Sequence, residues 1–226
     1  MARKKQFAIL GLGRFGMSMA KTLSEKGFDV MAVDEDPDAV QIASEFVTHA
    51  VRADVTDELS MRSLGVGNFD VVVVAIASHL ESSAMATLIV KEMGIKYIVA
   101  KAKDDMQKKI LEKIGADRVI FPEREMGTRI ANSLVYGNFF EFMELSDEFG
   151  IAEFEPLKEW VGKTLAQTEI RAKYGLNVVA VKSNGRVEAS PRADRVFKER
   201  EIIIVMGEST QIQRFLDKNS KRGEGY

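Results

Sequence analysis

The sequence contains no cysteine, only two histidines, and neither a long apolar run nor an excess of positive charge. The absence of cysteine excludes disulfide bonds and thiol catalysis, and it fits a reducing compartment. The longest wholly apolar run, Val71 to Ala77, is far shorter than the roughly 20 residues that span a bilayer. The basic start is not followed by the cleavage site of a signal peptide. We therefore expect a cytoplasmic protein that reaches a membrane only through a partner.

Positive and negative charges are balanced along the whole chain. Residues up to Gly137 carry 18 Lys and Arg against 19 Asp and Glu, and the later residues carry 14 against 15. Neither part has the basic excess that nucleic-acid binding usually needs, which argues against a redox-sensing transcription factor.

With 226 residues and 46% apolar content, the chain is long enough for two small domains that each bury a core.

The first 137 residues alternate short apolar runs with helix-like segments. Val- and Ile-rich runs without polar alternation are typical of strands that are buried on both faces, as in a parallel sheet. This βαβ rhythm predicts a Rossmann-like doubly wound domain over residues 1–137. The expected strands lie at 7–10, 29–34, 49–54, 71–77, 97–102 and 118–122, and the expected helices open at the glycine turn and lie near 37–45, 57–64, 80–93, 104–113 and 123–136.

The second half has a different pattern, which predicts a small α+β domain over residues 138–220. Strand-like runs lie near 141–146, 150–155, 176–182 and 201–206, a short helix near 164–169, a hairpin turn at "SNGR" and a last helix after Ser209. We interpret "FFEFMEL" at 139–145 as the hinge into this domain, with its phenylalanines either in the core or at a subunit interface. The polar stretch 221–226 is expected to be a flexible tail.

The glycine-rich stretch "FAILGLGRFG" is the strongest functional signal. Gly11, Gly13 and Gly16 follow a strand and open a helix, which allows a tight turn, close approach of a phosphate and close packing of helix on strand. Backbone N–H groups and the helix dipole then face the anion. Asp34 ends the next strand, where a carboxylate accepts hydrogen bonds from ribose hydroxyls and disfavours the 2′-phosphate of NADP. These residues predict a nucleotide site.

Two further charged residues lie near this turn in the predicted fold. Asp54 follows the third strand and is placed either to meet the adenine or its ribose, or to be a solvated loop acid. Arg14 puts a positive charge inside the turn, which matches a polyphosphate better than a nicotinamide riboside, unless it points outward into solvent. NAD, ATP and ADP share the adenosine and the first phosphates, so the turn alone does not choose among them.

Motifs that suggest catalysis fail on their context, so we expect no catalytic residue and no enzyme. Tyr97 and Lys101 have the Y-x-x-x-K spacing of short-chain dehydrogenases, but they fall on a predicted strand, where they are roughly 13 Å apart. His49 and His79 fit strand-end or helix-start positions. "GKT" at 162–164 lacks the earlier glycine of a phosphate loop. The alternative, an NAD-dependent oxidoreductase, lacks a proton donor.

Five stretches carry a resemblance to a known family, from about residue 5 to residue 218: "KKQFAILGLGRFG", "VMAVDED", "ATLIVKEMG", "LEKIGADRVIFPEREMG" and "IRAKYGLNVVAVK". In these stretches the sequence resembles the cytosolic gating subunits of Ktr-type bacterial potassium uptake systems, the KtrA and KtrC group of the regulator-of-K⁺-conductance (RCK) family. The resemblance implies an octameric ring, bound to a dimeric membrane pore subunit of KtrB or KtrD type, and so a peripheral position on the inner face of the cell membrane.

The same resemblance implies ligands for the first domain. It implies that ATP or ADP binds, that ATP favours the conducting state and that ADP favours the closed one. NAD or NADH stays the alternative that the glycine turn leaves open. Lys101 would face the cleft, and Glu123 matches an acid that binds Mg²⁺ or Ca²⁺ between subunits; its place after Pro122 also fits a contact to phosphates. Arg14 would also reach the nucleotide of a neighbouring subunit. The implied phosphate contacts are Gly11, Gly13, Arg14, Phe15 and Gly16, with Asp34 on the ribose.

For the second domain, the resemblance implies binding of cyclic di-AMP at a dimer interface. The positions that match are Ile170, Arg171, Ala172, Asn177 and Pro191. The sequence departs from some relatives in the hairpin, where Ser183 and Asn184 replace histidines.

Overall fold

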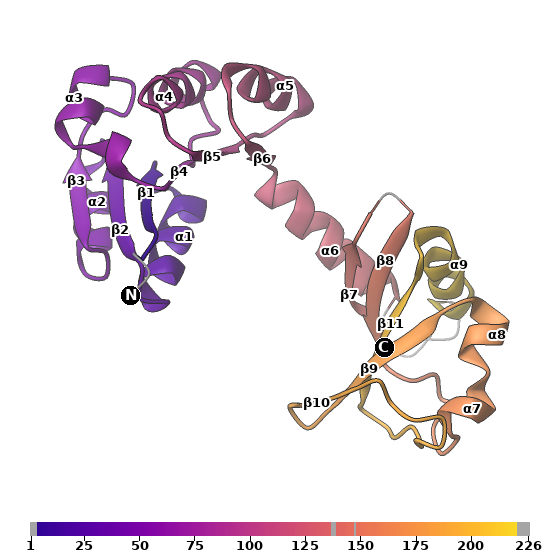
Figure 1. The fold of residues 1–226 in the computed structure, drawn as a ribbon. Helices are drawn as coiled ribbons and strands as arrows, with labels where there is room; N and C mark the ends of the chain where they lie inside the picture. Colours follow the sequence, from indigo (N-terminus) through magenta and orange to yellow (C-terminus); the bar gives the residue numbers. More distant parts are fainter. Residues whose placement is uncertain (1–3, 137–138, 147, 221–226) are drawn as a thin grey trace. The chain divides into compact units, whose positions relative to one another are not determined.

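The chain forms two compact units, Met1–Arg124 and Glu125–Tyr226, each with its own core (Figure 1). The computed structural model describes residues 4–136, 139–146 and 148–220. The predicted domain boundary after Gly137 and the predicted tail at 221–226 lie outside the described residues. Within the described ranges, none of the helices combines the length and apolarity needed to cross a membrane.

The first unit is built on a parallel sheet with the strand order β3-β2-β1-β4-β5-β6. This order reverses between β1 and β4, which confirms the predicted doubly wound topology. The strands are β1 (Gln6–Leu10), β2 (Asp29–Asp34), β3 (His49–Arg52), β4 (Val71–Val74), β5 (Tyr97–Lys101) and β6 (Arg118–Ile120). The helices are α1 (Arg14–Glu25), α2 (Pro37–Ser44), α3 (Glu58–Ser63) with a 3₁₀ turn at Val66–Asn68, α4 (Leu80–Glu92) and α5 (Asp105–Ile114). A further helix, α6 (Pro122–Tyr136), begins in this unit, and its residues from Glu125 on belong to the second unit.

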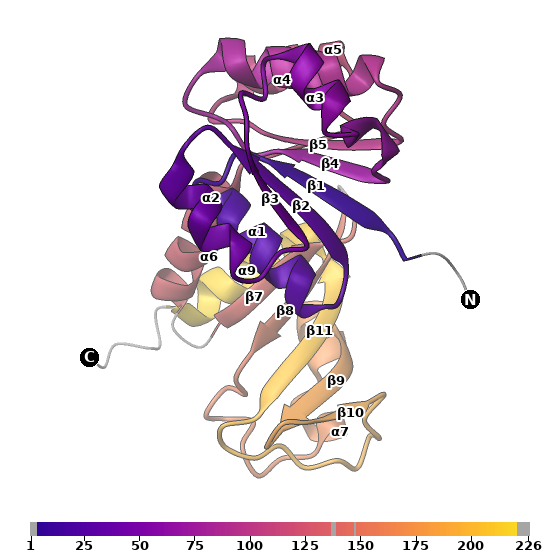
Figure 2. The same cartoon turned by 90° about the vertical axis from the view of Figure 1, so that its left-hand side faces the viewer.

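Helices cover both faces of this sheet, because alternate residues of each strand point to opposite sides. Ile9 packs into a core with Ala20 of α1, whereas its neighbour Leu10 packs into a second core with Leu111 of α5. Figure 2 shows α1 and α2 on one side of the strands and α3, α4 and α5 on the other. Burial on both faces explains why the strands are continuous apolar runs.

The second unit holds an antiparallel sheet with the order β10-β9-β11-β8-β7. Its core is aromatic: Trp160 is buried, with its ring centroid 5.7 Å from that of Phe215 and 6.4 Å from that of Phe197. The strands are β7 (Phe139–Glu144), β8 (Phe149–Phe154), β9 (Asn177–Ser183), β10 (Arg186–Ala189) and β11 (Ile202–Glu208). The helices are α7 (Leu165–Thr168), α8 (Ile170–Tyr174) and α9 (Ser209–Ser220).

One sequence-based expectation for this unit was wrong and one helix was missed. The stretch 139–145 is not a hinge: it contributes β7, in agreement with the strand expected near 141–146, and β7 pairs with β8 so that Met143 lies opposite Ile151. The helix expected near 164–169 is confirmed as α7, but α8 was not predicted. Glu169 adopts a left-handed conformation with φ of 51°, which ends α7 and lets α8 begin in a new direction.

Two local features of this unit, a helix start and a hairpin turn, were predicted correctly. The Thr164 hydroxyl accepts a hydrogen bond from the Gln167 N–H at 3.2 Å, and the Gln167 side chain accepts one from the Thr164 N–H at 2.8 Å. This capping box starts α7, in agreement with the helix expected near 164–169. Asn184 and Gly185 both have positive φ, 49° and 76°, which is the conformation of a two-residue hairpin turn between β9 and β10.

A buried ion pair fastens the loop before β11. The Glu201 side chain is 3% exposed, and it accepts hydrogen bonds from the Arg195 guanidinium at 2.6 and 2.9 Å and from the Lys198 N–H at 2.8 Å. Arg195 also donates to the exposed Glu188 at 3.1 Å. Burial acts to raise the pKa of Glu201, but the hydrogen bonds from Arg195 and Lys198 outweigh it, so the pKa is lowered.

We predict that Glu201→Gln lowers the free energy of unfolding of the second unit by roughly 2–4 kcal/mol at pH 7, because it leaves Arg195 poorly compensated. The measurement is a denaturant titration that follows Trp160, the single tryptophan, which is buried in the same unit. Since the folded-state pKa of Glu201 is depressed, the difference from wild type should vanish as pH falls through that pKa, below the ordinary 4.5. Glu188→Gln is the matched control and should cost under about 1 kcal/mol; equal losses would contradict the prediction.

Candidate functional site

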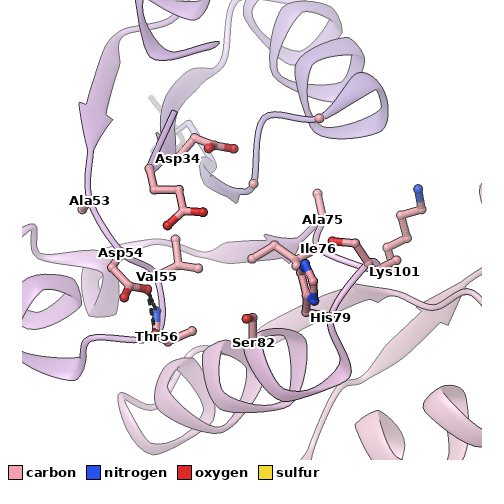
Figure 3. Close-up of a pocket in the computed structure, with 15 residues that line it drawn as sticks. Asp34, Ala53, Asp54, Val55, Thr56, Ala75, Ile76, His79, Ser82 and Lys101 are labelled. Carbon is pink, nitrogen blue, oxygen red and sulfur yellow. Dashed lines mark hydrogen bonds between the residues drawn. The ribbon is translucent and has the colours of Figure 1, made fainter. Parts of the chain in front are cut away.

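A pocket of about 370 Å³ opens where the carboxyl ends of β1 to β5 meet (Figure 3). This edge of a doubly wound sheet, at the point where the strand order reverses, is where such folds bind ligands. Of the residues predicted from the sequence, the pocket is lined by Gly11, Gly13, Asp34, Asp54 and Lys101. The residues that the sequence did not reveal are Glu35, Ala53, Val55, Thr56, Ala75, Ile76, Ala77, Ser78, His79 and Ser82.

The three glycines of the turn have three different surroundings. Gly11 has φ of 97°, and a Cβ there would lie 2.8 Å from Ile76 Cγ1. A Cβ on Gly16 would lie 1.9 Å from the Gly11 carbonyl oxygen, so only glycine lets α1 approach the turn this closely. Gly13 is exposed at the pocket, and a Cβ there would meet nothing within 4 Å. The open space in front of Gly13 is therefore available to a ligand.

Asp34 holds the glycine turn in place. Its Oδ2 accepts a hydrogen bond from the Leu12 N–H at 2.5 Å, and its Oδ1 accepts one from the Asp36 N–H at 2.9 Å. The turn is also attached to β2 by the Gly11 N–H, which donates to the Val33 carbonyl at 2.9 Å. Each carboxylate oxygen can accept a second hydrogen bond, so the ribose contact predicted for Asp34 is compatible with this support.

The far wall of the pocket comes from β3 and from the start of α4. Asp54 accepts hydrogen bonds from the Thr56 N–H at 2.8 Å and from its hydroxyl at 2.7 Å, and Figure 3 shows this pair at the acidic end. His79 is the N-cap of α4, and no side-chain hydrogen bond caps this helix. Its position at a helix start was predicted. The sequence could have indicated that His79 lies in the pocket, because His79 closely follows the carboxyl end of β4, at the edge of the sheet where the pocket opens.

Lys101 and Glu123, which were both expected near the phosphates, are bonded to each other. The Lys101 amine lies 2.5 Å from Glu123 Oε1 and 5.9 Å from the centroid of the Phe15 ring. The hydrogen bond from Lys101 lowers the pKa of Glu123, the charge of Arg14 adds to this, and partial burial opposes it. Arg14 is exposed, and Phe15 packs partly against the core under α1 and α2.

The site contains no arrangement for the catalytic roles considered above. Tyr97 and Lys101 stand at the two ends of β5, as predicted, and so do not act as a helical pair. His49 begins β3 at the opposite edge of the sheet from the pocket. Among the described residues, no group of three or more His, Cys, Asp or Glu side chains is arranged to hold a metal ion.

The positions matched to cyclic di-AMP lie on three segments that meet at β9. Arg171 and Ala172 are exposed on α8, which leads through Gly175 into β9, where Asn177 is the first residue. The Ser190 N–H donates to the Val179 carbonyl at 2.8 Å, which brings the loop with Pro191 to the same strand. The Ile170 side chain is buried in the core, so only its backbone atoms could make the contact that the resemblance implies.

A doubly wound sheet with this glycine turn and an acid at the end of β2 is typical of Rossmann-type nucleotide-binding proteins. Residues 7–122 match the TrkA-N domain and residues 151–219 match the TrkA-C domain. The Ktr system potassium uptake protein C of Bacillus subtilis (strain 168) is 46% identical and covers 94% of this chain and 96% of its own length. Protein A of the same system and organism is 40% identical with the same coverage.

The chain therefore belongs to the Ktr family of potassium uptake proteins, with a TrkA-N and a TrkA-C domain. This agrees with the expectation that it is not an enzyme, since these relatives are uptake proteins. Its fold is similar to the GsuK channel, with a TM-score of 0.68 and 19% identity over 95% of this chain and 39% of that one. The GsuK channel bound to NAD has a TM-score of 0.65 with 20% identity over 93% of this chain and 38% of that one.

The different surroundings of Gly13 and Gly16 predict different effects on folding. Gly16→Ala should destabilise the first unit by about 3 kcal/mol or more, because the added methyl group displaces α1 from the turn. Gly13→Ala should cost under about 1 kcal/mol, since the site is open and the residue change affects only the helix N-cap. Thermal unfolding followed by circular dichroism measures both. Similar losses for the two variants would show that the close contact at Gly16 is not what positions α1.

Proposed function

We propose that this protein is the cytosolic regulatory subunit of a bacterial potassium uptake system and that it binds ATP or ADP in the pocket at β1 to β5. The observation that carries the proposal is the open space in front of Gly13, at the start of α1 and beside Asp34. The relatives named above are potassium uptake proteins. We propose a KtrB- or KtrD-type pore subunit as the partner, contacted by an octameric ring at the inner face of the membrane.

The charges around the pocket favour one orientation of the nucleotide. Asp34, Glu35 and Asp54 make one end acidic, which suits ribose hydroxyls and amino groups of the base. At the other end α1 begins without a side-chain cap and without an acidic residue in its first turn, so its N–H groups remain available to a phosphate. Lys101 adds a positive charge on this side. We therefore place the ribose against Asp34 and the phosphates over Gly13.

The proposed role of the nucleotide is to select a conformation, without being converted. ATP and ADP share every adenosine contact, so only groups that touch the terminal phosphate discriminate between them. A ligand shifts a conformational equilibrium only by its difference in affinity for the two states. Arg14 is exposed beside the turn, and we propose that it reaches the terminal phosphate in a neighbouring subunit of the ring, with ATP favouring the conducting state and ADP the closed one.

Glu123 is the proposed ligand for a divalent cation, Mg²⁺ or Ca²⁺, at the same end of the pocket. Its side chain is exposed and ionised beside Lys101 and Arg14. A hard cation requires several oxygen ligands, so one carboxylate is too few. The remaining ligands would be phosphate oxygens and the equivalent glutamate of another subunit.

Nucleotide binding is tested by calorimetric titration of ADP and ATP onto wild type and Gly13→Asp. The aspartate is a good N-cap, so the melting temperature should not fall, but its charge occupies the space for the phosphate. Affinity should drop by about 100-fold or more. Gly127→Asp, where an added Cβ also meets nothing within 4 Å, controls for the added charge. Unchanged binding by Gly13→Asp would refute the site, and steady oxidation of NADH by the wild type would favour the oxidoreductase instead.

Binding of cyclic di-AMP is proposed for the second unit and can be tested separately. Arg171→Ala should weaken binding by about 10-fold or more, because a charge-assisted hydrogen bond to phosphate is lost. Lys173→Ala on the same helix is the matched control, since Lys173 is paired with Glu169 at 2.8 Å. Gly13→Asp should leave this affinity unchanged. Weak binding by Gly13→Asp together with normal binding by Arg171→Ala would reject the assignment.

A further inference from the structure

The ion pair between Lys101 and Glu123 joins the pocket to the first turn of α6. Lys101 ends β5 and lines the pocket, with its side chain 15% exposed, whereas the Glu123 side chain is 67% exposed. We propose that Glu123 competes with the nucleotide's phosphate for the Lys101 amine and thereby sets the affinity for the nucleotide. This inference rests on the proposed nucleotide site. It makes Glu123 a residue that tunes nucleotide affinity even where no cation is bound.

The position of the amine supports competition. Figure 3 shows the Lys101 side chain rising from the edge of the pocket with its nitrogen turned away from Asp54 and His79. The nitrogen lies 2.5 Å from Glu123 Oε1 and 5.9 Å from the Phe15 ring. Phe15 belongs to the first turn of α1, whose N–H groups face the proposed phosphate. One amine therefore lies within reach of two anionic positions, of which Glu123 holds it.

The properties of the two side chains decide how the competition ends. A lysine has three donors on a flexible stem, so its amine can turn from one acceptor to another. Two anions that share one amine repel each other, and an exposed carboxylate is readily solvated by water. The nucleotide must therefore displace or weaken the bond to Glu123, and part of its binding free energy is lost in doing so.

A divalent cation should reverse the role of Glu123. A cation that binds the carboxylate removes the competitor and leaves the Lys101 amine to the phosphate. By thermodynamic linkage, the nucleotide then raises the affinity for the cation by the same factor. Nucleotide and cation should therefore bind with positive coupling, and part of this coupling acts through Lys101 inside a single chain.

The test is calorimetric titration of ADP in EDTA with four proteins: wild type, Glu123→Gln, Lys101→Met and the double variant. Glu123→Gln should bind ADP about threefold to tenfold more tightly than wild type, because the amine is released. Lys101→Met should bind more weakly. In the Lys101→Met background, the increase in ADP affinity caused by Glu123→Gln should fall to under about twofold. Glu125→Gln removes the same charge two residues further along α6, and it should change nothing.

Each alternative outcome has a distinct meaning. Unchanged or weaker binding by Glu123→Gln in EDTA would overturn the competition. An equal gain with and without Lys101 would also overturn it, since simple repulsion of the phosphate by Glu123 would then explain the effect. When the titrations are repeated with Mg²⁺, the difference in ADP affinity between wild type and Glu123→Gln should become smaller or change sign. An unchanged difference would overturn the coupling between nucleotide and cation. If none of the four proteins binds ADP or ATP, the nucleotide site itself is wrong.

Discussion

The close contact between Gly16 and the Gly11 carbonyl oxygen determines where α1 begins, and the rest of the site depends on it. A side chain at Gly16 would place its Cβ 1.9 Å from that oxygen. Because the helix is in close contact with the turn, its first N–H groups open onto the carboxyl edge of the sheet, beside Asp34. Asp34 in turn binds the Leu12 N–H, so the residue expected to hold the ribose also supports the loop that would hold the phosphates.

The pocket is suited to binding a charged ligand more than to changing it. Acidic groups at and after the carboxyl ends of β2 and β3 stand opposite Lys101 and the uncapped start of α1, an arrangement that would orient the proposed adenine nucleotide along the edge of the sheet. A proton donor would need a partner to set its reactivity. Within the described part of the chain the candidate pair, Tyr97 and Lys101, lies at opposite ends of one strand. The proposed role of this site is therefore to sense a nucleotide through the conformation that the bound nucleotide favours.

The sequence predicted those features that depend on local periodicity or on backbone conformation. Buried parallel strands, the turn from Gly11 to Gly16, the cap at Thr164 and the hairpin at Asn184 all belong to this class. The sequence did not predict α8, because this helix begins after Glu169, a non-glycine residue in a left-handed conformation that local sequence signals do not indicate. It also placed Lys101 and Glu123 near one pocket without showing their bond, because residues 22 positions apart meet only once β5 and α6 are in place.

Two ion pairs lie at the start of α6, Lys101–Glu123 and Arg124–Asp105, and the second holds the helix in place when the first is broken. Arg124 donates to Asp105 at 2.9 and 3.3 Å and stacks 4.1 Å from the Phe121 ring centroid, which anchors α6 to the start of α5. If phosphate draws Lys101 from Glu123, this anchor remains, so the first turn of α6 should stay attached to the start of α5. The exchange is therefore confined to the side chains of Lys101 and Glu123. The free energy that the exchange makes available is the difference between the two binding partners of one lysine.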